Sequence, residues 1–267
     1  VGYEITVGGG LGRTPMIGKV VRDHLPKADL LAYLEAIMRV YNLEGRRDNK
    51  YKARVKILVH EIGADEFTRR VEEEFARLDG PSVNADPAEI ERIAAYFAPP
   101  SYEVLPETSR TFEAMKAANP AFARWVEVNT TPHKAPGYTA LTISLKPIGE
   151  APGDATSDQM RLVADLAEEF SHAEIRVTHA QNLVLPHVRK RDLFAIWRRL
   201  GEAGLASANV GLITDIIACP GLDYCALATA RSIPIAQAIQ HRFADAARER
   251  DIGALNIKIS GCINACG

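Results

Sequence analysis

All four cysteines of this 267-residue chain lie within its last 49 residues, and no other feature constrains its fold as strongly. Five residues separate Cys219 from Cys225, three separate Cys262 from Cys266, and 36 residues lie between the two pairs. Each pair follows a segment with the pattern of a β-strand, so we expect each pair on a loop at a strand end. Loops that follow neighbouring strands can converge, and the four thiols are then expected to form one metal site.

The spacing of the cysteines favours an iron–sulfur cluster over zinc. Structural zinc sites usually have more closely spaced ligand pairs, whereas iron–sulfur clusters are larger and accept wider, irregular spacings. Small and turn-forming residues surround the cysteines and would let the backbone approach a bulky cluster: Pro220, Gly221, Gly261, Ala265 and Gly267. A structural zinc module and four unrelated buried thiols are the alternatives at this point.

The overall composition is that of an ordinary globular chain, with 47% hydrophobic and 25% charged residues. A net charge of −2 provides no global field that would attract nucleic acid or an acidic membrane. No apolar run approaches the roughly 20 residues of a membrane span, and no charged-then-apolar leader is present. The charge and the lack of a long apolar run lead us to expect neither nucleic acid nor a membrane as a partner. Four cysteines are too few for a disulfide scaffold, so we expect a reduced, cytoplasmic compartment.

Hydrophobic periodicity in the first half of the chain predicts a short strand over residues 3–7 and helices over 27–42, 49–62 and 64–78. In the first helix we expect one face to be buried: Leu30, Leu31, Leu34, Ile37, Met38 and Tyr41. In the third helix we expect Phe67, Val71, Phe75 and Leu78 to point inward. Residues 79–136 contain eight prolines, which predicts a long, irregular connection with one helix near residues 88–97 and aromatic side chains that pack onto a core.

The second half of the chain has a recognisable order of elements. Its patterns predict a strand over 138–146, a helix over 157–170 capped by Thr156 or Ser157, strands over 174–178 and 182–185, and a helix over 191–203 ended by Gly204. This order is most of a ferredoxin-like α+β unit. Beyond it we expect a strand over 210–217, a helix over 226–250 interrupted by Pro234, and a strand over 255–259.

The glycine-rich segment VGGGLGRTP, residues 7–15, suggests a nucleotide-binding loop at first sight. The third glycine of the dinucleotide fingerprint would fall at Arg13, and no Gly-Lys-Ser/Thr sequence follows. We therefore interpret the segment as a tight crossing loop.

Two cysteine segments, ACPGLDYCALA (218–228) and SGCINACG (260–267), resemble the signature of the sirohaem nitrite and sulfite reductase family. That signature is Cys-x5-Cys followed by (Ser/Thr)-Gly-Cys-x-Asn-x-Cys-Gly, and the departure here is Ile263, where proline is common. Three further segments resemble the family in the same order: VGGGLGRTP, RRDNKYKARVKILV and THAQNLVLP.

The resemblance implies an α+β fold in which a ferredoxin-like half-domain is flanked by parts of two pseudo-symmetric sirohaem-binding α/β modules. Residues 1–78 would be the C-terminal part of the first module, 79–136 the proline-rich connection, 137–206 the second ferredoxin-like half-domain, and 207–267 the truncated start of the second sirohaem and 4Fe–4S module. The chain would then be an interior fragment of a longer enzyme and inactive by itself.

The resemblance also implies an activity, namely the six-electron reduction of sulfite to sulfide at a sirohaem coupled to a 4Fe–4S cluster. Nitrite reduction to ammonia is the alternative within the family, and an iron–sulfur electron carrier without substrate chemistry is the alternative from another class. The cluster ligands would be Cys219, Cys225, Cys262 and Cys266, with Cys266 also bridging to the sirohaem iron. The partners implied are a small oxyanion substrate and an electron donor, either ferredoxin or a flavoprotein reductase.

Basic residues are dense between positions 46 and 56, with six cations in eleven positions: Arg46, Arg47, Lys50, Lys52, Arg54 and Lys56. Such a run is usually a solvated helix face, but the resemblance implies that Arg54 and Lys56 bind the anion and assist its protonation. On a regular helix Lys52 and Lys56 share a face and Arg54 does not, so either the segment is irregular or only some of these residues reach the iron.

Three amide side chains are implied near the cofactors by the same resemblance. Asn264 lies between the last two cysteines, and Gln181 and Asn182 lie in the predicted turn between two strands. For each of them a turn-forming role without cofactor contact is the alternative.

Overall fold

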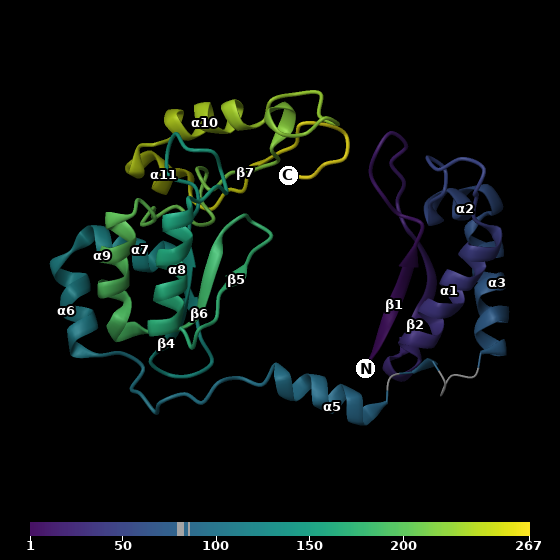
Figure 1. Ribbon diagram of the computed structural model, residues 1–267, viewed down its shortest axis with the longest axis horizontal. Coiled ribbons are helices and arrows are strands. Elements are labelled where there is room, and N and C mark those ends of the chain that lie inside the picture. Colours follow the sequence, from purple (N-terminus) through teal and green to yellow (C-terminus); the bar gives the residue numbers. More distant parts are fainter. Residues whose placement is uncertain (79–82, 85) are drawn as a thin grey trace. The chain divides into compact units, whose positions relative to one another are not determined.

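The computed structural model describes residues 1–78, 83–84 and 86–267, so the start of the predicted connection, at 79–82 and 85, lies outside the described residues. The chain forms two compact units, Val1–Pro99 and Pro100–Gly267 (Figure 1). Among the helices of the described residues, none is long and apolar enough to cross a membrane.

The first unit is an antiparallel hairpin packed against three helices. Strands β1 (Gly2–Val7) and β2 (Lys19–Pro26) form the hairpin, and the glycine-rich segment is its tip, closed by a bridge between Gly10 and Met16. The helices are α1 (Leu30–Glu44), which follows the 3-10 turn η1 (Lys27–Asp29), α2 (Val55–Ile62) and α3 (Ala64–Arg77). The strand over 3–7 is confirmed, whereas strand β2 was not predicted.

The predicted buried face of the first helix is wrong for three of its six residues, while Leu30, Ile37 and Tyr41 belong to the core or pack against it. Leu31, Leu34 and Met38 are between 42% and 51% exposed, while Tyr33 and Ala36 are fully buried. Helix α1 carries two apolar stripes, and periodicity alone could not choose between them. The stripe that faces the core contains small alanine side chains, which allow the neighbouring helices and strands to approach closely. Its residues are Ala32, Tyr33, Ala36, Ile37 and Val40.

The predicted helix over 49–62 begins only at Val55. The Asn49 side chain accepts a hydrogen bond from the Tyr51 amide (3.0 Å), and the Asn49 carbonyl accepts one from the Lys52 amide (2.9 Å). Such local bonds compete with the helical ladder, so the residues before α2 form turns. The third helix is confirmed, with Phe67 and Val71 fully buried.

The predicted irregular connection is largely wrong within its described part. The helix near 88–97 is confirmed as α5 (Pro87–Tyr96), but the structure adds α6 (Arg110–Ala118), α7 (Pro120–Asn129) and strand β3 (Thr130–Pro132). Pro87 and Pro120 each occupy the first turn of a helix, where a missing amide proton is tolerated, so these prolines start helices. The aromatic prediction holds for Phe122 and Trp125, which are fully buried.

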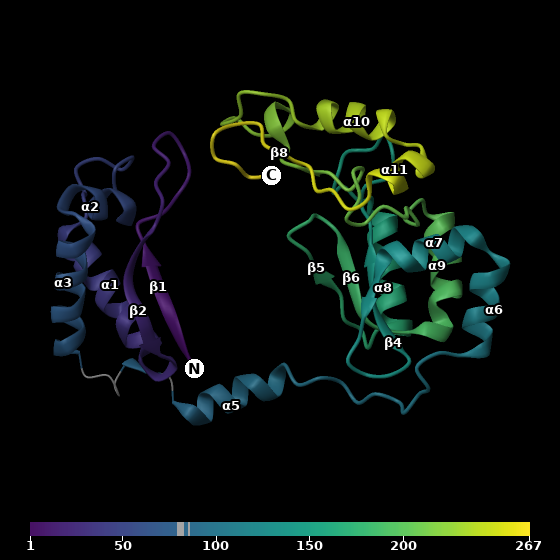
Figure 2. The ribbon, with the colours of Figure 1, turned by 180° about the vertical axis from the view of Figure 1, so that it is seen from behind.

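The second unit contains the expected ferredoxin-like arrangement. A four-stranded antiparallel sheet has the order β3-β4-β6-β5, with β4 (Tyr138–Ile143), β5 (Arg176–Val177) and β6 (Leu183–Arg189). Helices α8 (Ser157–Phe170) and α9 (Leu193–Glu202), the latter after the 3-10 turn η2 (Lys190–Asp192), lie with α6 and α7 on one side of this sheet (Figures 1 and 2). Thr156 caps α8 in a capping box, as the sequence suggested.

A second, smaller sheet completes this unit. Strands β7 (Ile217–Ala218) and β8 (Lys258–Ile259) pair in parallel, and the chain between them forms the 3-10 turn η3 (Gly221–Asp223) and helices α10 (Ile233–Arg242) and α11 (Ala246–Ile252). The predicted strand over 210–217 is wrong up to residue 216, because Asn209 and Leu212 accept turn hydrogen bonds. The predicted helix over 226–250 is two helices, and Pro234 lies in the first turn of α10.

Candidate functional site

The two cysteine loops leave the same end of the small parallel sheet. Cys219 directly follows β7, and Cys262 follows β8 by three residues. The Cys219 amide donates to the Ile259 carbonyl at 3.0 Å, which extends the ladder to the start of the loops. The predicted convergence of loops from neighbouring strands is therefore present, because the carboxyl ends of parallel strands meet at one edge.

Glycines allow the two loops to touch. A Cβ atom on Gly261 would lie 2.8 Å from the Gly221 Cα atom and 2.9 Å from the Ala230 carbonyl oxygen. The Gly261 carbonyl accepts hydrogen bonds from the amides of Thr229 (2.8 Å) and Ala230 (3.0 Å), so the first loop is fastened to the second. Any larger residue at Gly261 would separate the two loops.

The first cysteine already has a thiolate-stabilising environment. Cys219 is buried, its Sγ atom accepts the Gly261 amide proton at 2.9 Å, and the Ser232 hydroxyl lies 3.4 Å from the same sulfur. The bond to Ser232, followed by the Gly261 amide, lowers the pKa of the Cys219 thiol below its ordinary value, against the opposing effect of burial. The thiolate is the form that binds metals.

The other three cysteines are more accessible, since Cys225 and Cys262 are half-buried and Cys266 is exposed. Among the described residues, no group of three or more His, Cys, Asp or Glu side chains could hold a metal ion. The four-sulfur ligand set therefore stays a prediction. The donor chemistry nevertheless fits an iron–sulfur cluster, because the loops offer four thiols, close-packed glycines and an amide proton already directed at sulfur.

Gln181 lies beside the first cysteine loop. Its Nε2 atom donates to the Ala218 carbonyl at 2.8 Å, and its Oε1 atom accepts from the Ala218 amide at 3.0 Å. The structure thus brings Gln181 next to the residue that precedes Cys219. Asn264, in contrast, is exposed on the second loop and makes no side-chain hydrogen bond within the described residues, so its cofactor role stays a prediction.

Asn182 is almost completely buried and bound to protein groups. Its Nδ2 atom donates to Asp215 at 3.0 Å, and its Oδ1 atom accepts from the Leu145 amide at 3.1 Å. Both ends of the amide are engaged in this way, which is the behaviour of a structural side chain. Contact between Asn182 and a cofactor stays an untested prediction.

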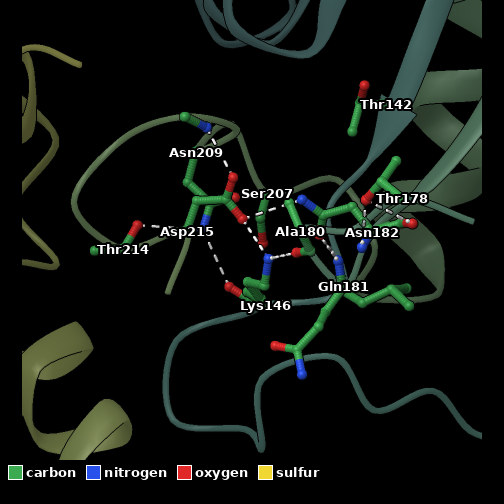
Figure 3. Close-up of polar contacts among 12 residues, drawn as sticks. Thr142, Lys146, Thr178, Ala180, Gln181, Asn182, Ser207, Asn209, Thr214 and Asp215 are labelled. Atoms are coloured by element: carbon green, nitrogen blue, oxygen red, sulfur yellow. Dashed lines mark hydrogen bonds and ion pairs between the residues drawn. The ribbon is translucent and has the colours of Figure 1, made fainter. Parts of the chain in front are cut away.

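A buried ion pair, which the sequence analysis missed, lies at the centre of this region (Figure 3). The Lys146 ammonium is fully buried, lies 2.6 Å from the Asp215 carboxylate, and also donates to the Ala180 carbonyl. The other Asp215 oxygen accepts the Gly211 amide proton at 2.8 Å. Lys146 and Asp215 each lie in an otherwise apolar stretch of the sequence. Charged residues are rarely buried without a partner, so this pattern could have indicated a buried ion pair.

The predicted substrate lysine, Lys56, lies in the first unit and is only 7% exposed. Its Nζ atom donates to the carbonyls of Leu11 and Thr14, both at 2.8 Å, so it holds the glycine-rich hairpin tip. None of the ion pairs among the described residues includes Lys56. Its positive charge is thus solvated by neutral carbonyls and has no carboxylate partner.

A cavity of about 460 Å³ lies beside Lys56, and Lys19 and His60 also line it. Such a volume is in the usual range of small-molecule sites. Arg54, the other predicted catalytic residue, is exposed at the N-cap of α2 and pairs with no carboxylate within the described part of the chain. The turns before α2 show that the basic segment is irregular, which is one of the two alternatives that the spacing of Lys52, Arg54 and Lys56 left open.

Comparisons with known proteins agree with these features. A family profile described as "Nitrite and sulphite reductase 4Fe-4S domain" matches residues 1–78, and one described as "Nitrite/Sulfite reductase ferredoxin-like half domain" matches residues 132–203. The cysteine loops lie outside both matched segments.

Curated relatives match nearly the whole chain. A Mycolicibacterium paratuberculosis protein named sulfite reductase (ferredoxin) 2 is 26% identical over 99% of this chain and 41% of its own length. A Synechococcus elongatus protein named ferredoxin–nitrite reductase is 24% identical over 100% of this chain and 45% of its own length. The chain therefore spans less than half the length of these relatives.

A solved structure shares the fold. The structure of the Mycobacterium tuberculosis NirA protein matches with a TM-score of 0.65 and 23% identity, and covers 99% of this chain and 42% of that one.

Proposed function

The chain belongs to the sirohaem nitrite and sulfite reductase family, and on that premise we propose that it is part of an enzyme that reduces sulfite to sulfide with six electrons. The observation that carries the proposal is the meeting of the two cysteine loops at one end of the β7–β8 sheet. Nitrite reduction to ammonia is the second candidate, because a relative of comparable similarity is named a nitrite reductase.

In this proposal Cys219, Cys225, Cys262 and Cys266 hold a 4Fe–4S cluster, and Cys266 is also the thiolate shared with a sirohaem iron. When bound, these two groups supply the electron storage that no side chain can provide. The protein's own contribution here is to keep thiolates available. The amide of Gly261 does so at the Cys219 sulfur, while the hydroxyl of Ser232 donates to the Cys219 carbonyl at 2.7 Å and holds the same residue. Asn264 is proposed to orient the second loop.

Lys56 is proposed to bind the substrate oxyanion and to donate protons to its oxygens, which must leave as water. A buried ammonium without a carboxylate partner attracts an anion strongly, since its charge is uncompensated. Arg54 is proposed to assist from the N-cap of α2, where its guanidinium is exposed. The remaining basic residues of the segment would neutralise the carboxylates of sirohaem.

The electron donor is proposed to be ferredoxin, the donor in the names of the two relatives above, with a flavoprotein reductase as the alternative. We place the enzyme in the cytoplasm, where thiols stay reduced.

Metal, sulfide and absorption analysis of the full-length protein tests this proposal. We expect sirohaem bands together with iron and acid-labile sulfide, and loss of both centres in Cys266→Ser. Iron and sulfide without haem bands would instead support an electron carrier. Zinc without iron would support a structural zinc module and contradict the proposed function.

A further inference from the structure

The Gln181 side chain occupies the open edge of strand β7. On the other edge, the amides of Ile217 and Cys219 donate to the carbonyls of Ile257, just before β8, and of Ile259, in β8, both at 3.0 Å. The amide and carbonyl of Ala218 therefore face away from β8. Gln181 satisfies both groups with one primary amide, at 3.0 and 2.8 Å, as a neighbouring strand would.

The backbone around Gln181 is itself held in place. Gln181 has a positive φ of 56°, a conformation that favours glycine or asparagine and persists only where its surroundings enforce it. The preceding residue, Ala180, receives a hydrogen bond from Lys146, and the following residue, Asn182, donates to Asp215. The buried ion pair thus fixes the turn on both sides of Gln181.

The direction of the Gln181 side chain is also constrained. In Figure 3 it points away from the Asp215 carboxylate, while the side-chain amide of Asn182 donates to that carboxylate. A Cβ atom on Gly153 would lie 3.0 Å from the Gln181 Cβ atom, so the next loop packs tightly against the side chain.

From this chain of contacts we propose that Gln181 is a positioning residue for Cys219. The Lys146–Asp215 pair fixes the turn, the turn directs Gln181, and Gln181 holds Ala218, so that the Cys219 sulfur occupies a defined position as a cluster ligand. The proposal rests on the proposed function in that it takes Cys219 to be a ligand. Gln181 itself touches neither cluster nor substrate in this role.

The test compares Gln181→Met with Gln159→Met in the full-length protein. Gln159 is a matched control, because it also forms two amide–backbone bonds, from the Thr156 amide and to the Ala203 carbonyl, both at 2.9 Å. The readouts are hydrogen exchange at the Ala218 amide, the rate of iron release to a chelator, and the reduction potential of the cluster.

We expect Gln181→Met to accelerate Ala218 exchange and to speed iron release about 10- to 100-fold, the usual effect of losing an outer-shell partner of a metal ligand. Gln159→Met should change neither. Gln181→Glu retains an acceptor for the Ala218 amide and should give an intermediate rate of iron release. This milder variant keeps the proposal testable if Gln181→Met does not fold.

Unchanged iron release and potential in Gln181→Met would overturn the positioning role and leave the proposed function intact. Equally accelerated iron release in Gln181→Met and Gln159→Met would also overturn the positioning role. The effect would then reflect a general loss of stability and not the contact with Ala218. A wild-type protein without iron and sulfide would overturn the proposed function, and the positioning role with it.

Discussion

Two of the lysines that the structure describes are buried, one in each unit, and their ammonium groups have different partners. Lys146 is 0% exposed and lies 2.6 Å from the Asp215 carboxylate. Lys56 is 7% exposed and binds two main-chain carbonyls, those of Leu11 and Thr14. Burial removes both ammonium groups from water, which is unfavourable for a charge. Among the described residues only Lys146 has a carboxylate partner that compensates for this loss.

We expect this difference between a structural cation and one that is available to a ligand. Burial lowers the pKa of Lys146, and the bond to Asp215 counteracts that effect and favours the charged pair. Such a pair is internally neutral and has little attraction left for a ligand. Lys56 keeps its net charge beside a cavity, where an anion can complete its coordination.

The largest stability effect should come from breaking the structural pair. Lys146→Met leaves Asp215 buried without a counter-charge, which should lower the free energy of unfolding by about 3 to 5 kcal/mol in urea titrations. The double variant Lys146→Met/Asp215→Asn should recover much of that loss, because no charge is then left unpaired and the amide oxygen can still accept a hydrogen bond from Asn182 or Gly211. Similar losses in the single and double variants would contradict the assignment of Lys146 as a charge-paired residue.

The comparison also requires that the first unit has its own core. Ile37→Ala should cost about 3 kcal/mol, since this side chain is buried between α1 and its neighbours. The matched change Leu34→Ala, on the exposed stripe of the same helix, should stay within about 0.5 kcal/mol. Thermal or urea unfolding measures both, and a larger loss for Leu34→Ala than for Ile37→Ala would contradict the assignment of Leu34 to the exposed stripe.

The close approach of the cysteine loops predicts a smaller effect. Gly261→Ala places a methyl group 2.8 Å from Gly221 and 3.3 Å from the Cys219 sulfur, and should cost about 1 to 3 kcal/mol. Gly201→Ala is the control, because its nearest neighbour would be 3.9 Å away in a helix that favours alanine. Equal unfolding midpoints for both variants would mean that the loops tolerate separation.

The smallest expected effect is a pH dependence in the second unit. Burial lowers the pKa of His187 below its ordinary value of 6.5, although the Glu174 carboxylate opposes the shift. Other groups facing His187 come from several segments: Tyr102, His133, His172 and Arg176. Because the unfolded chain binds a proton more readily at this histidine, its contribution to stability is complete above pH 6.5 and is lost as the pH falls through the folded pKa.

Urea titrations between pH 7.5 and 5 check this dependence, and His187→Gln should flatten it. A variant with the same slope as the wild type would assign the pH dependence to other groups.

Local patterns predicted much of the fold, and the exceptions have physical causes. Helix α8 with its Thr156 cap and the order of the ferredoxin-like elements follow from periodicity and capping. The irregular connection was wrong because Pro87 and Pro120 start helices there. The prediction that Leu31, Leu34 and Met38 of α1 are buried was wrong because the helix carries two apolar stripes. Only tertiary packing decides which stripe faces the core.

The site was predictable where its residues are close in sequence. Cysteine spacing and the strand pattern around each pair placed the two loops together. The Lys146–Asp215 pair joins residues 69 positions apart, and no local pattern specifies such a partner. The contact between Gln181 and Ala218 could not be predicted for the same reason, because the two residues are 37 positions apart. The sequence around Gln181 indicated only a hairpin turn.

The most direct test of the account is a sulfite titration of the full-length protein, followed at the haem absorption bands. Lys56→Met should keep both cofactors and weaken sulfite binding about 100-fold, as expected when one charged donor to an anion is lost. Lys27→Met, which removes an exposed lysine of the first unit outside the basic segment, should bind like the wild type. Unchanged sulfite affinity in Lys56→Met would contradict the claim that an uncompensated buried lysine marks the substrate site.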